Sequence, residues 1–438
     1  MADAFPDRRT IAAEQLVQLR LLLGALLPGN RFYRAKLSAA GVVADIGSLD
    51  EFSQRFPFTT KEEIVEDQRS NPPYGTHLTF PLERYTRLHA TSGTTGAPLR
   101  WLDTPESWNW MVENWTQVFR AAGVTAAERV FFAFSFGPFI GFWLAYEAAQ
   151  RMGCLCIPGG GLSSATRLRV MIDNGVTVLC STPTYAARLA EVAAAEKIDL
   201  RTARIKTIIV AGEPGGSIPA TRARLTGLWN GARIFDHHGM TEVGPVTYEC
   251  PKRPGVLHVI ESGHYAEVVD PSNGKSAGAG ETGELILTTL GRTGSPLLRY
   301  STGDLVRPIP QPSTLNPQPC VCGRHELALD GGILGRVDDM VIVRGVNVHP
   351  SAVEDIIRSC GDVAEYQVTV AKQNSLVELS VRVETTPDCA DPAAVVKRLE
   401  KRFHDAFALR VPVTAVVAGS LPRFEMKAQR WQRLPGAP

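Results

Sequence analysis

The stretch 91–98, Thr-Ser-Gly-Thr-Thr-Gly-Ala-Pro, is the segment around which the rest of the chain can be interpreted. Its two glycines allow backbone conformations with positive φ, and the hydroxyl side chains add donors to the backbone amides, so the stretch can wrap a polyphosphate. An ordinary Ser/Thr/Gly turn has the same composition. The stretch lacks the Gly-Lys-Ser/Thr ending of the common nucleotide-triphosphatase loop. A lysine that acts on phosphate must therefore come from elsewhere in the chain.

The segments that flank this loop predict an α/β fold. Residues 84–90 alternate as a strand does, and residues 99–102 predict the returning strand. Further along, apolar runs alternate with helical segments. The runs lie at 130–134, 155–157, 176–180, 207–210 and 233–235. Such alternation predicts a mainly parallel sheet covered on both faces, with ligands beyond the carboxyl ends of its strands.

The pattern changes after Gly244 to short strands and turns, which predict a β subdomain over about 245–337. In the last hundred residues, helices are expected at 352–359 and 392–407 and strands at 366–370 and 378–383, enough for a small α+β module. We therefore expect a large N-terminal domain with mainly parallel sheets and a β subdomain, followed by a small α+β domain.

Composition excludes several classes of protein. The 438 residues are 44% hydrophobic and 21% charged with a net charge of +1, which gives no reason to expect nucleic acid or an acidic membrane as partner. The N-terminus lacks the apolar core of a secretory signal, and the uncharged run 130–146 is interrupted by glycine and proline and is shorter than a membrane span of about 20 residues. We expect a cytoplasmic protein without a transmembrane helix.

Five motifs in order resemble the adenylate-forming superfamily, and four further segments look like its phenylacetate-CoA ligase family. The superfamily motifs are the loop at 91–96, Gly239-Met240-Thr241-Glu242, Tyr300-Ser301-Thr302-Gly303-Asp304, Gly335-Arg336-Val337-Asp338-Asp339 and the near-terminal Lys427. The family segments are Ala211-Gly212-Glu213-Pro214, Glu249-Cys250, Cys320-Val321-Cys322-Gly323-Arg324 and Arg344-Gly345-Val346-Asn347-Val348. The resemblance runs from about residue 32 to the C-terminus.

This resemblance implies that a carboxylate attacks the α-phosphate of ATP to give an acyl-adenylate and pyrophosphate, and that coenzyme A then takes the acyl group. The acid is expected to be aromatic or arylacetic. Two alternatives stay open: an adenylation enzyme that loads a carrier-protein thiol, and a nucleotide-binding protein without chemistry.

The resemblance also implies roles for single residues. The ATP-binding residues would be Thr91, Ser92, Gly93, Thr94, Thr95, Gly96, Gly212, Glu213, Pro214, Asp236, His237, His238, Gly239, Met240, Thr241, Asp304 and Arg336. Among the catalytic residues Lys427, Thr241 and Glu242, Thr241 would bond the α-phosphate and Glu242 would hold Mg²⁺. Asp304 would accept from the ribose hydroxyls, although a turn residue after Gly303 is the local alternative, and Lys427 without the motifs would be a surface lysine.

The boundary between the domains would fall at Asp338, which the resemblance makes a hinge, so that 1–337 and 338–438 are the expected domains. The small domain would rotate to present Lys427 for the first step and Arg344, Gly345 and Val346 to coenzyme A for the second. A homodimer fits the family.

An aryl-acid pocket is expected beside the strand that begins at 130. Phe136, Gly137, Phe142 and Tyr146 would form its walls with His237 and Gly239, although aromatic stripes are commonly core. His237 could approach the acid or be a packed histidine, and His238 stands where the superfamily often has a tyrosine on the adenine.

Four further residues have the composition of a structural zinc site. Cys250, His258, Cys320 and Cys322 supply three sulfurs and one nitrogen. The single residue between Cys320 and Cys322 is an unusual spacing, and four unconnected loop residues are the alternative.

Overall fold

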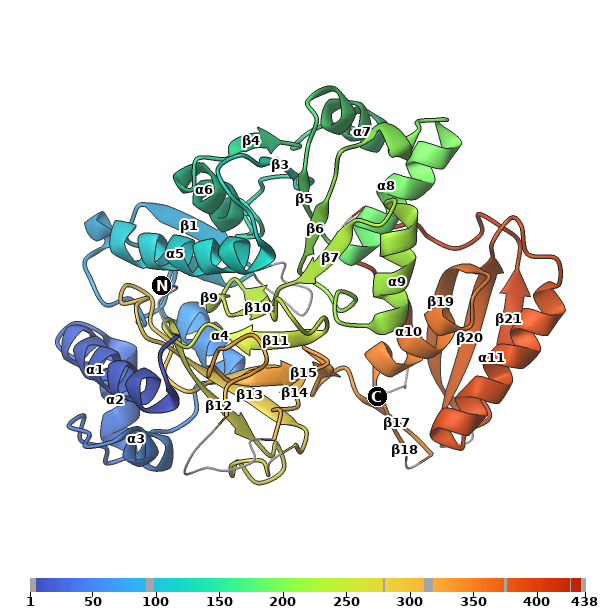
Figure 1. Cartoon of the computed structure of the whole chain (residues 1–438). Coiled ribbons are helices and arrows are strands. Elements are labelled where there is room, and N and C mark those ends of the chain that lie inside the picture. Colours follow the sequence, from blue (N-terminus) through green and yellow to red (C-terminus); the bar gives the residue numbers. More distant parts are fainter. Residues whose placement is uncertain are drawn as a thin grey trace.

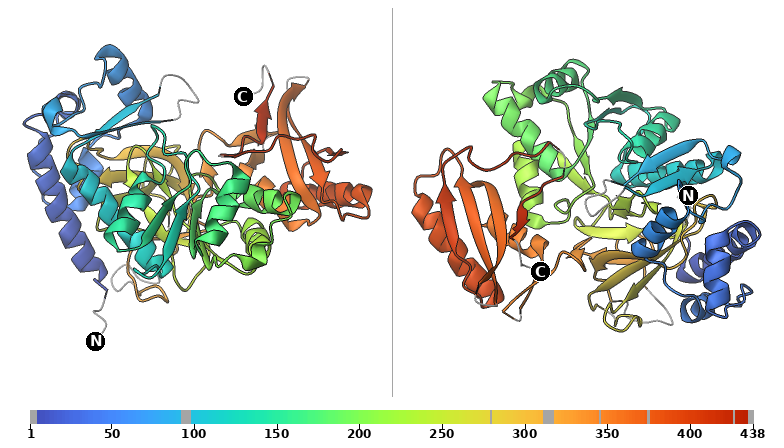
Figure 2. Two further views of the ribbon diagram at one scale, coloured as in Figure 1. Left: turned by 90° about the horizontal axis from the view of Figure 1, so that it is seen from above. Right: turned by 180° about the vertical axis from the view of Figure 1, so that it is seen from behind.

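The computed structural model describes residues 5–91, 98–278, 280–310, 318–344, 346–373, 376–425 and 427–434. Helices of the N-terminus lie at one end of the molecule and the C-terminal part lies at the other, which Figure 1 shows and both views of Figure 2 repeat. The expected α/β fold with a large N-terminal part and a smaller C-terminal α+β part is confirmed.

A five-stranded parallel sheet in the order β4-β3-β5-β6-β7 is the scaffold of the larger part. Successive side chains of a strand point to opposite faces. Val130 and Phe132 accordingly join the core made with α5 and α6, whereas Phe131 joins the core made with α7, α8 and α9. The strands are β3 (Arg129–Phe132), β4 (Leu155–Pro158), β5 (Val178–Ser181), β6 (Thr207–Val210) and β7 (Arg233–Asp236). The helices are α5 (Pro105–Ala122), α6 (Trp143–Arg151), α7 (Ser164–Asp173), α8 (Pro183–Ala195) and α9 (Pro219–Leu228), with a 3-10 turn η2 (Leu200–Thr202) after α8.

Helix α5 shows how local signals set the ends of an element. The hydroxyl of Thr104 accepts from the backbone N–H of Ser107, Pro105 occupies the first turn, and Gly123 ends the helix with φ of 80°. A left-handed residue at this position is easiest for glycine. The same kind of signal begins α4 (Lys61–Ser70), where Thr60 and Glu63 form a capping box.

Antiparallel strands form the predicted β subdomain. One sheet has the order β12-β13-β14-β16 and a second has the order β10-β11-β15. Its strands are β10 (Thr247–Glu249), β11 (Val256–Val259), β12 (His264–Val269), β13 (Gly283–Thr289), β14 (Tyr300–Val306), β15 (Ala328–Asp330) and β16 (Gly335–Arg336). Two small hairpins complete this part: β1 (Arg87–Ala90) with β2 (Arg100–Asp103), after the 3-10 turn η1 (Leu82–Arg84), and β8 (Gly239–Met240) with β9 (Gly244–Pro245).

The N-terminal helices α1 (Arg8–Leu26), α2 (Arg31–Ala39) and α3 (Leu49–Arg55) bury their apolar faces with Tyr265, Leu290 and Leu298 of the β subdomain. Within the described residues, no helix taken singly has the length and apolarity needed to cross a bilayer, although α1 and α2, bent by 107°, meet that criterion as a pair.

The C-terminal part has a four-stranded sheet in the order β21-β20-β19-β22. Its elements are β19 (Val363–Gln373), β20 (Leu376–Thr385), β21 (Val413–Val416), β22 (Trp431–Arg433), α10 (Pro350–Ser359), α11 (Pro392–Phe407) and the hairpin β17 (Val341–Val343) with β18 (Val346–Val348). The antiparallel pair β19 and β20 is extended on each side by a short parallel strand, β22 and β21. These two edge strands were not predicted, because each is only three or four residues long.

Candidate active site

The predicted phosphate loop joins β1 to β2. Thr91 closes its base: the amide of Thr91 donates to the carbonyl of Leu99 over 3.0 Å, and the amide of Leu99 donates to the hydroxyl of Thr91 over 3.0 Å. Ser92, Gly93, Thr94, Thr95 and Gly96 lie outside the described residues. The strand-to-strand setting of the loop is the one that the sequence predicted.

Lys427 lies against the Gly212–Glu213 segment, which follows strand β6. A methyl group added at Gly212, whose φ is 95°, would lie 3.5 Å from Cε of Lys427. The neighbouring amide of Ala428 donates to Oε2 of Glu213 over 2.7 Å, while Oε1 of Glu213 accepts from the amide of Thr184 over 2.8 Å. Glu213 therefore ties the C-terminal segment that carries the lysine to the start of α8. Burial raises the pKa of Glu213, although both amides favour its charged form.

A line of polar side chains connects His238 to the proposed hinge. Nε2 of His238 and Oδ2 of Asp304 lie 3.0 Å apart, but neither of these buried atoms has a hydrogen-bond partner among the described residues. Arg336 pairs with Oδ1 of Asp304 at 3.3 Å and with Asp338 at 2.9 Å. Asp338 lies in the turn after β16, where its carbonyl accepts from Arg433 over 3.1 Å.

A buried arginine that the sequence did not suggest holds the Thr241-Glu242 backbone. Arg292 makes a bidentate pair with Asp103, 2.7 Å for each bond, and its Nη1 donates to the carbonyls of Thr241 and Glu242, also at 2.7 Å. The side chain of Glu242 is 6% exposed, and its Oε1 lies 4.0 Å from Nζ of Lys61. Arg292 and Asp103 are 189 residues apart, so no local pattern could have paired them.

Asp236 is the last residue of β7 and His237 follows it, and both side chains are buried and bonded to protein atoms. Oδ2 of Asp236 accepts from the hydroxyl of Ser217 over 2.5 Å, so this carboxylate faces the segment that precedes α9. Nδ1 of His237 lies 2.6 Å from the carbonyl of Thr247 and therefore carries the proton. Burial lowers the pKa of His237 to about 3, so its imidazole is neutral near pH 7. His237 is a packed, uncharged side chain.

The predicted walls of the acid pocket lie in one aromatic cluster beside β3 and α6. Phe136, which has φ of 52°, makes edge-to-face contacts with Tyr146 at 5.6 Å and with Trp143 at 4.9 Å. Phe142 contacts Trp115 of α5 at 6.1 Å, and Trp115 lies 4.3 Å from His237. Trp115 and Trp143 were not among the predicted pocket residues.

Glycines in this cluster allow close approach, and the ring that approaches Gly141 belongs to the protein. A Cβ at Gly141 would lie 2.1 Å from Phe134. Gly137 instead uses its carbonyl, which accepts from Nε1 of Trp143 over 3.1 Å. A Cβ at Gly239 would lie 2.8 Å from the carbonyl of Gly244, so this glycine is needed for the β8–β9 hairpin.

The residues expected at coenzyme A lie within the β17–β18 hairpin of the C-terminal part, where Arg344 follows β17 and Val346 begins β18. Arg344 has φ of 49° and pairs with Glu378 of β20, and Val346 is partly buried against the C-terminal core. Gly345 lies outside the described residues. In Figure 1 the hairpin lies at the lower edge of the molecule, well away from β1. This arrangement brings Lys427, and not Arg344, to the Gly212–Glu213 segment.

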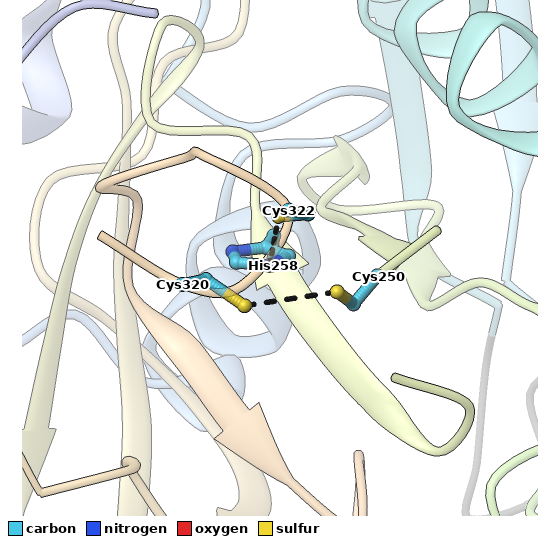
Figure 3. Close-up of side chains that lie close together, drawn as sticks. All are labelled: Cys250, His258, Cys320 and Cys322. Carbon is cyan, nitrogen blue, oxygen red and sulfur yellow. Dashed lines mark hydrogen bonds between the residues drawn. The ribbon is translucent and has the colours of Figure 1, made fainter. Parts of the chain in front are cut away.

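Cys250, His258, Cys320 and Cys322 come together from three segments, as Figure 3 shows. Their ligand atoms all lie within 4.8 Å of one another. Burial, together with nearby Arg324, lowers the pKa of His258 to about 4, so its imidazole is neutral. No other group of this kind occurs in the described ranges.

Comparison with known proteins places the chain in a class. Residues 60–291 match the family described as AMP-binding enzyme, and residues 345–432 match the family described as AMP-binding enzyme C-terminal domain. The chain is thus an adenylate-forming, AMP-binding enzyme.

Full-length relatives narrow this class. The chain is 32% identical over 435 residues to the phenylacetate-coenzyme A ligase of Escherichia coli strain K12. This alignment covers 96% of this chain and 94% of the Escherichia coli protein. The chain is 30% identical over 424 residues to the phenylacetate-coenzyme A ligase of Pseudomonas putida, covering 94% and 92%. The chain belongs to the phenylacetate-coenzyme A ligase family.

The structure of one similar enzyme is known in two states, and the two states superpose on this chain with different TM-scores. The 2-hydroxyisobutyryl-CoA ligase in its postadenylation state, in complex with R3-HIB-AMP, superposes with a TM-score of 0.90 at 25% identity, covering 99% of this chain and 91% of that chain. The same ligase in its thioesterification state, with 2-HIB-AMP and CoA, gives 0.72 at 27% identity, covering 98% and 91%. The present arrangement is therefore closer to the postadenylation state.

Proposed function

We propose that this enzyme ligates an aromatic or arylacetic carboxylic acid to coenzyme A through an acyl-adenylate and releases AMP and pyrophosphate. The observation that carries the proposal is the contact of the Lys427–Ala428 segment with Gly212 and Glu213. It brings a flexible cation from the end of the chain to the motif that the resemblance assigns to ATP.

Lys427 would supply positive charge during adenylation. The acid and the α-phosphate are both anions, and charge builds up on the phosphate oxygens as they react. Lys427 is exposed and forms no salt bridge with any of the described residues, so its positive charge is not already neutralised. An ammonium on a long stem can reach between the carboxylate and the phosphate.

The nucleoside would lie beside the pair of His238 and Asp304. Nε2 of His238 and Oδ2 of Asp304 lie 3.0 Å apart without a hydrogen bond between them, so the hydroxyl of a ribose bound beside them would give Oδ2 a donor. Asp304 would accept from the ribose hydroxyls and His238 would stack on the adenine, with Arg336 holding Asp304 in place. The segments Gly212–Pro214 and Gly239–Thr241 would line the base and the α-phosphate, with the loop at 91–96 around the outer phosphates.

Glu242 is the residue that would hold Mg²⁺ on the triphosphate. Its carboxylate oxygen suits a hard cation, and it already faces one cation, the ammonium of Lys61 at 4.0 Å. A bound Mg²⁺ would neutralise phosphate charge. The protein's own contribution is the bonding of Arg292 to the Thr241 and Glu242 carbonyls, which fixes the backbone from which both side chains project.

The acid would enter the aromatic cluster of Phe136, Phe142 and Tyr146, where edge-on contacts suit an aryl ring. Gly137 and Gly239 would border this pocket. His237 is neutral and its only N–H donates to the carbonyl of Thr247, so His237 would form a wall of the pocket and would not be a cationic partner for the carboxylate.

Thioester formation would follow a rotation of residues 338–438 against 1–337 about Asp338. The rotation would withdraw Lys427 and bring Arg344, Gly345 and Val346 to coenzyme A. The two states of the solved ligase, which match this chain with TM-scores of 0.90 and 0.72, support such a movement. Asp338 suits a hinge because it lies in a turn and its side chain is 66% exposed.

Several finer points belong to the same proposal. The enzyme would work as a homodimer in the cytoplasm, where ATP and coenzyme A are supplied. Size-exclusion chromatography tests the dimer by comparing the mass of the eluted protein with the 47.6 kDa of one chain. A carrier-protein thiol is the alternative acceptor. The cluster of Cys250 and its neighbours would hold a structural zinc ion without a part in the reaction.

Exchange of labelled pyrophosphate into ATP, measured with a panel of benzoate-, aminobenzoate- and phenylacetate-like acids, tests the first step. Exchange that depends on one class of acid is the expected result, and absence of exchange with every acid would favour a protein that only binds nucleotide. Thioester formation with free coenzyme A, compared with a panel of carrier proteins, then decides the acceptor.

A further inference from the structure

Three segments far apart in the sequence bring four metal-binding side chains to one place. Cys250 follows β10, His258 lies in β11, and Cys320 and Cys322 lie in the connection between β14 and β15. Cys250 and His258 are fully buried, and the two remaining cysteines are partly buried. None of the four belongs to the residues assigned above to ATP, acid or coenzyme A.

Two distances within this cluster match a tetrahedron around a zinc ion. With bonds of about 2.3 Å to sulfur and about 2.05 Å to nitrogen, tetrahedral angles place two sulfurs about 3.8 Å apart and a sulfur and a nitrogen about 3.6 Å apart. Sγ of Cys250 lies 3.7 Å from Sγ of Cys320, and Sγ of Cys322 lies 3.5 Å from Nε2 of His258. We propose that these four side chains bind one structural Zn²⁺ ion with a closed coordination shell.

A disulfide does not explain this geometry. The sulfurs of Cys250 and Cys320 would have to approach to about 2.05 Å for a disulfide bond. They lie 3.7 Å apart, and both cysteines are free. A bond between them would also leave Cys322 and His258 facing each other without a role for either.

The surroundings of His258 orient it as a ligand. Nδ1 of His258 is buried without a hydrogen-bond partner in the described part of the chain, and Nε2 is the nitrogen directed at Cys322 (Figure 3). Tyr248 stacks on its ring at 5.7 Å, and the guanidinium of Arg324 covers Tyr248 at 5.1 Å. These ring contacts limit rotation of the imidazole and keep Nε2 directed at Cys322.

The ion would pin the β14–β15 connection to the end of β10. Cys250 and Cys320 are 70 residues apart, so one ion would close a long loop between them. Directly before Cys250, Glu249 accepts the amide of Asp236 over 2.7 Å and pairs with Arg222 of α9. The metal would therefore stabilise β10, whose Glu249 accepts from the last residue of β7.

The test measures metal content in untagged protein produced in zinc-supplemented medium. We expect about one zinc per chain in the wild type and in Cys389→Ser, which changes a cysteine outside the cluster, and less than about 0.2 per chain in Cys320→Ser and Cys322→Ser. Limited proteolysis should then cut the zinc-poor variants within 318–327 sooner than the control.

Cobalt gives a second measurement that needs no variant to fold. Co²⁺ exchanged into the wild-type protein should show tetrahedral d–d absorption and a thiolate-to-cobalt band. Each of three results would overturn the proposal. They are wild-type protein that holds no zinc and shows no such bands, a zinc loss in Cys389→Ser equal to that in the cluster variants, and a Cys250–Cys320 disulfide found by mass spectrometry. Metal content and cobalt spectra are read without ATP or acid, so failure here is distinguishable from failure of the proposed ligase reaction.

Discussion

Replacing Lys427 with alanine should slow adenylation while leaving the fold and the second half-reaction intact. The lysine lies over Gly212, in the segment that Ala428 ties to Glu213. Because its ammonium is exposed and pairs with no acidic side chain in the described residues, its removal breaks no structural interaction, and the melting temperature should stay within a degree or two, as is typical of surface substitutions.

The size of the effect follows from charge and distance. A unit charge about 4 Å from charge developing on the phosphate is worth about 4 kcal/mol at an effective dielectric constant of about 20. Loss of one such donor at an oxyanion costs about 2.7–4 kcal/mol, which corresponds to a rate loss of about 10²–10³. We expect this loss in kcat for acid-dependent pyrophosphate exchange.

The assay separates the two half-reactions in Lys427→Ala. Thiolysis of a supplied acyl-adenylate by coenzyme A should proceed at the wild-type rate, since the lysine would have moved away. Lys397→Ala, which removes an exposed lysine of α11, is the matched control and should leave both steps unchanged. Equal losses in adenylation and thiolysis would refute the reasoning, because a residue presented in only one arrangement cannot act in both steps.

Three further substitutions test the hinge, a buried ion pair and a neutral histidine. Asp338→Pro should slow one half-reaction at least about tenfold more than the other. Asp338→Ala, which removes only the pairing with Arg336, should not produce this difference. Equal losses of rate in the two half-reactions of Asp338→Pro would count against the hinge. Arg292→Leu leaves Asp103 buried and unpaired and should lower the free energy of unfolding by about 3–5 kcal/mol in urea titrations, and a loss below about 1 kcal/mol would contradict the role given to this pair. Burial lowers the pKa of His264 to about 4, below its value of about 6.5 in the unfolded chain, so its contribution to stability is present above pH 6.5 and is lost as the pH falls towards 4. His264→Gln should therefore flatten the fall of unfolding free energy between about pH 6.5 and pH 4 by about 1.4 kcal/mol per pH unit, and parallel slopes for the two proteins would exclude this origin.

Elements whose ends are marked locally were predicted closely. The helix at Pro392–Phe407 and the strand at Thr207–Val210 have the predicted bounds, and Gly123 ends the helix that Thr104 begins. Capping hydroxyls, prolines and apolar periodicity act over one or two turns, so they can be recognised without knowing the tertiary contacts. The short edge strands β21 and β22 escaped, because their existence depends on the strands beside them.

The candidate site divides in the same way. The order of the motifs named Lys427, Asp304 and Glu242 as members of one constellation, and residue chemistry named the cysteines and the histidine of the metal cluster. The roles of Lys427, Asp304 and Glu242 were predicted from the resemblance and the zinc ligands from their residue types, and all of these roles stay predictions. Arg292 and Trp115 could not be inferred, since a buried arginine and a core tryptophan have no local pattern that distinguishes them.

The amino-acid sequence by itself determined the alternation of strands and helices, the helix ends and the chemical inventory, since these depend on neighbours within a few residues. Only the tertiary structure decided which members of that inventory meet. Ala428 bonds Glu213 across 215 residues, Arg292 bonds Asp103 across 189, and burial behind Trp115 makes His237 neutral. Such contacts and the local dielectric depend on how the sheets and domains pack, and no short-range pattern in the chain encodes that packing.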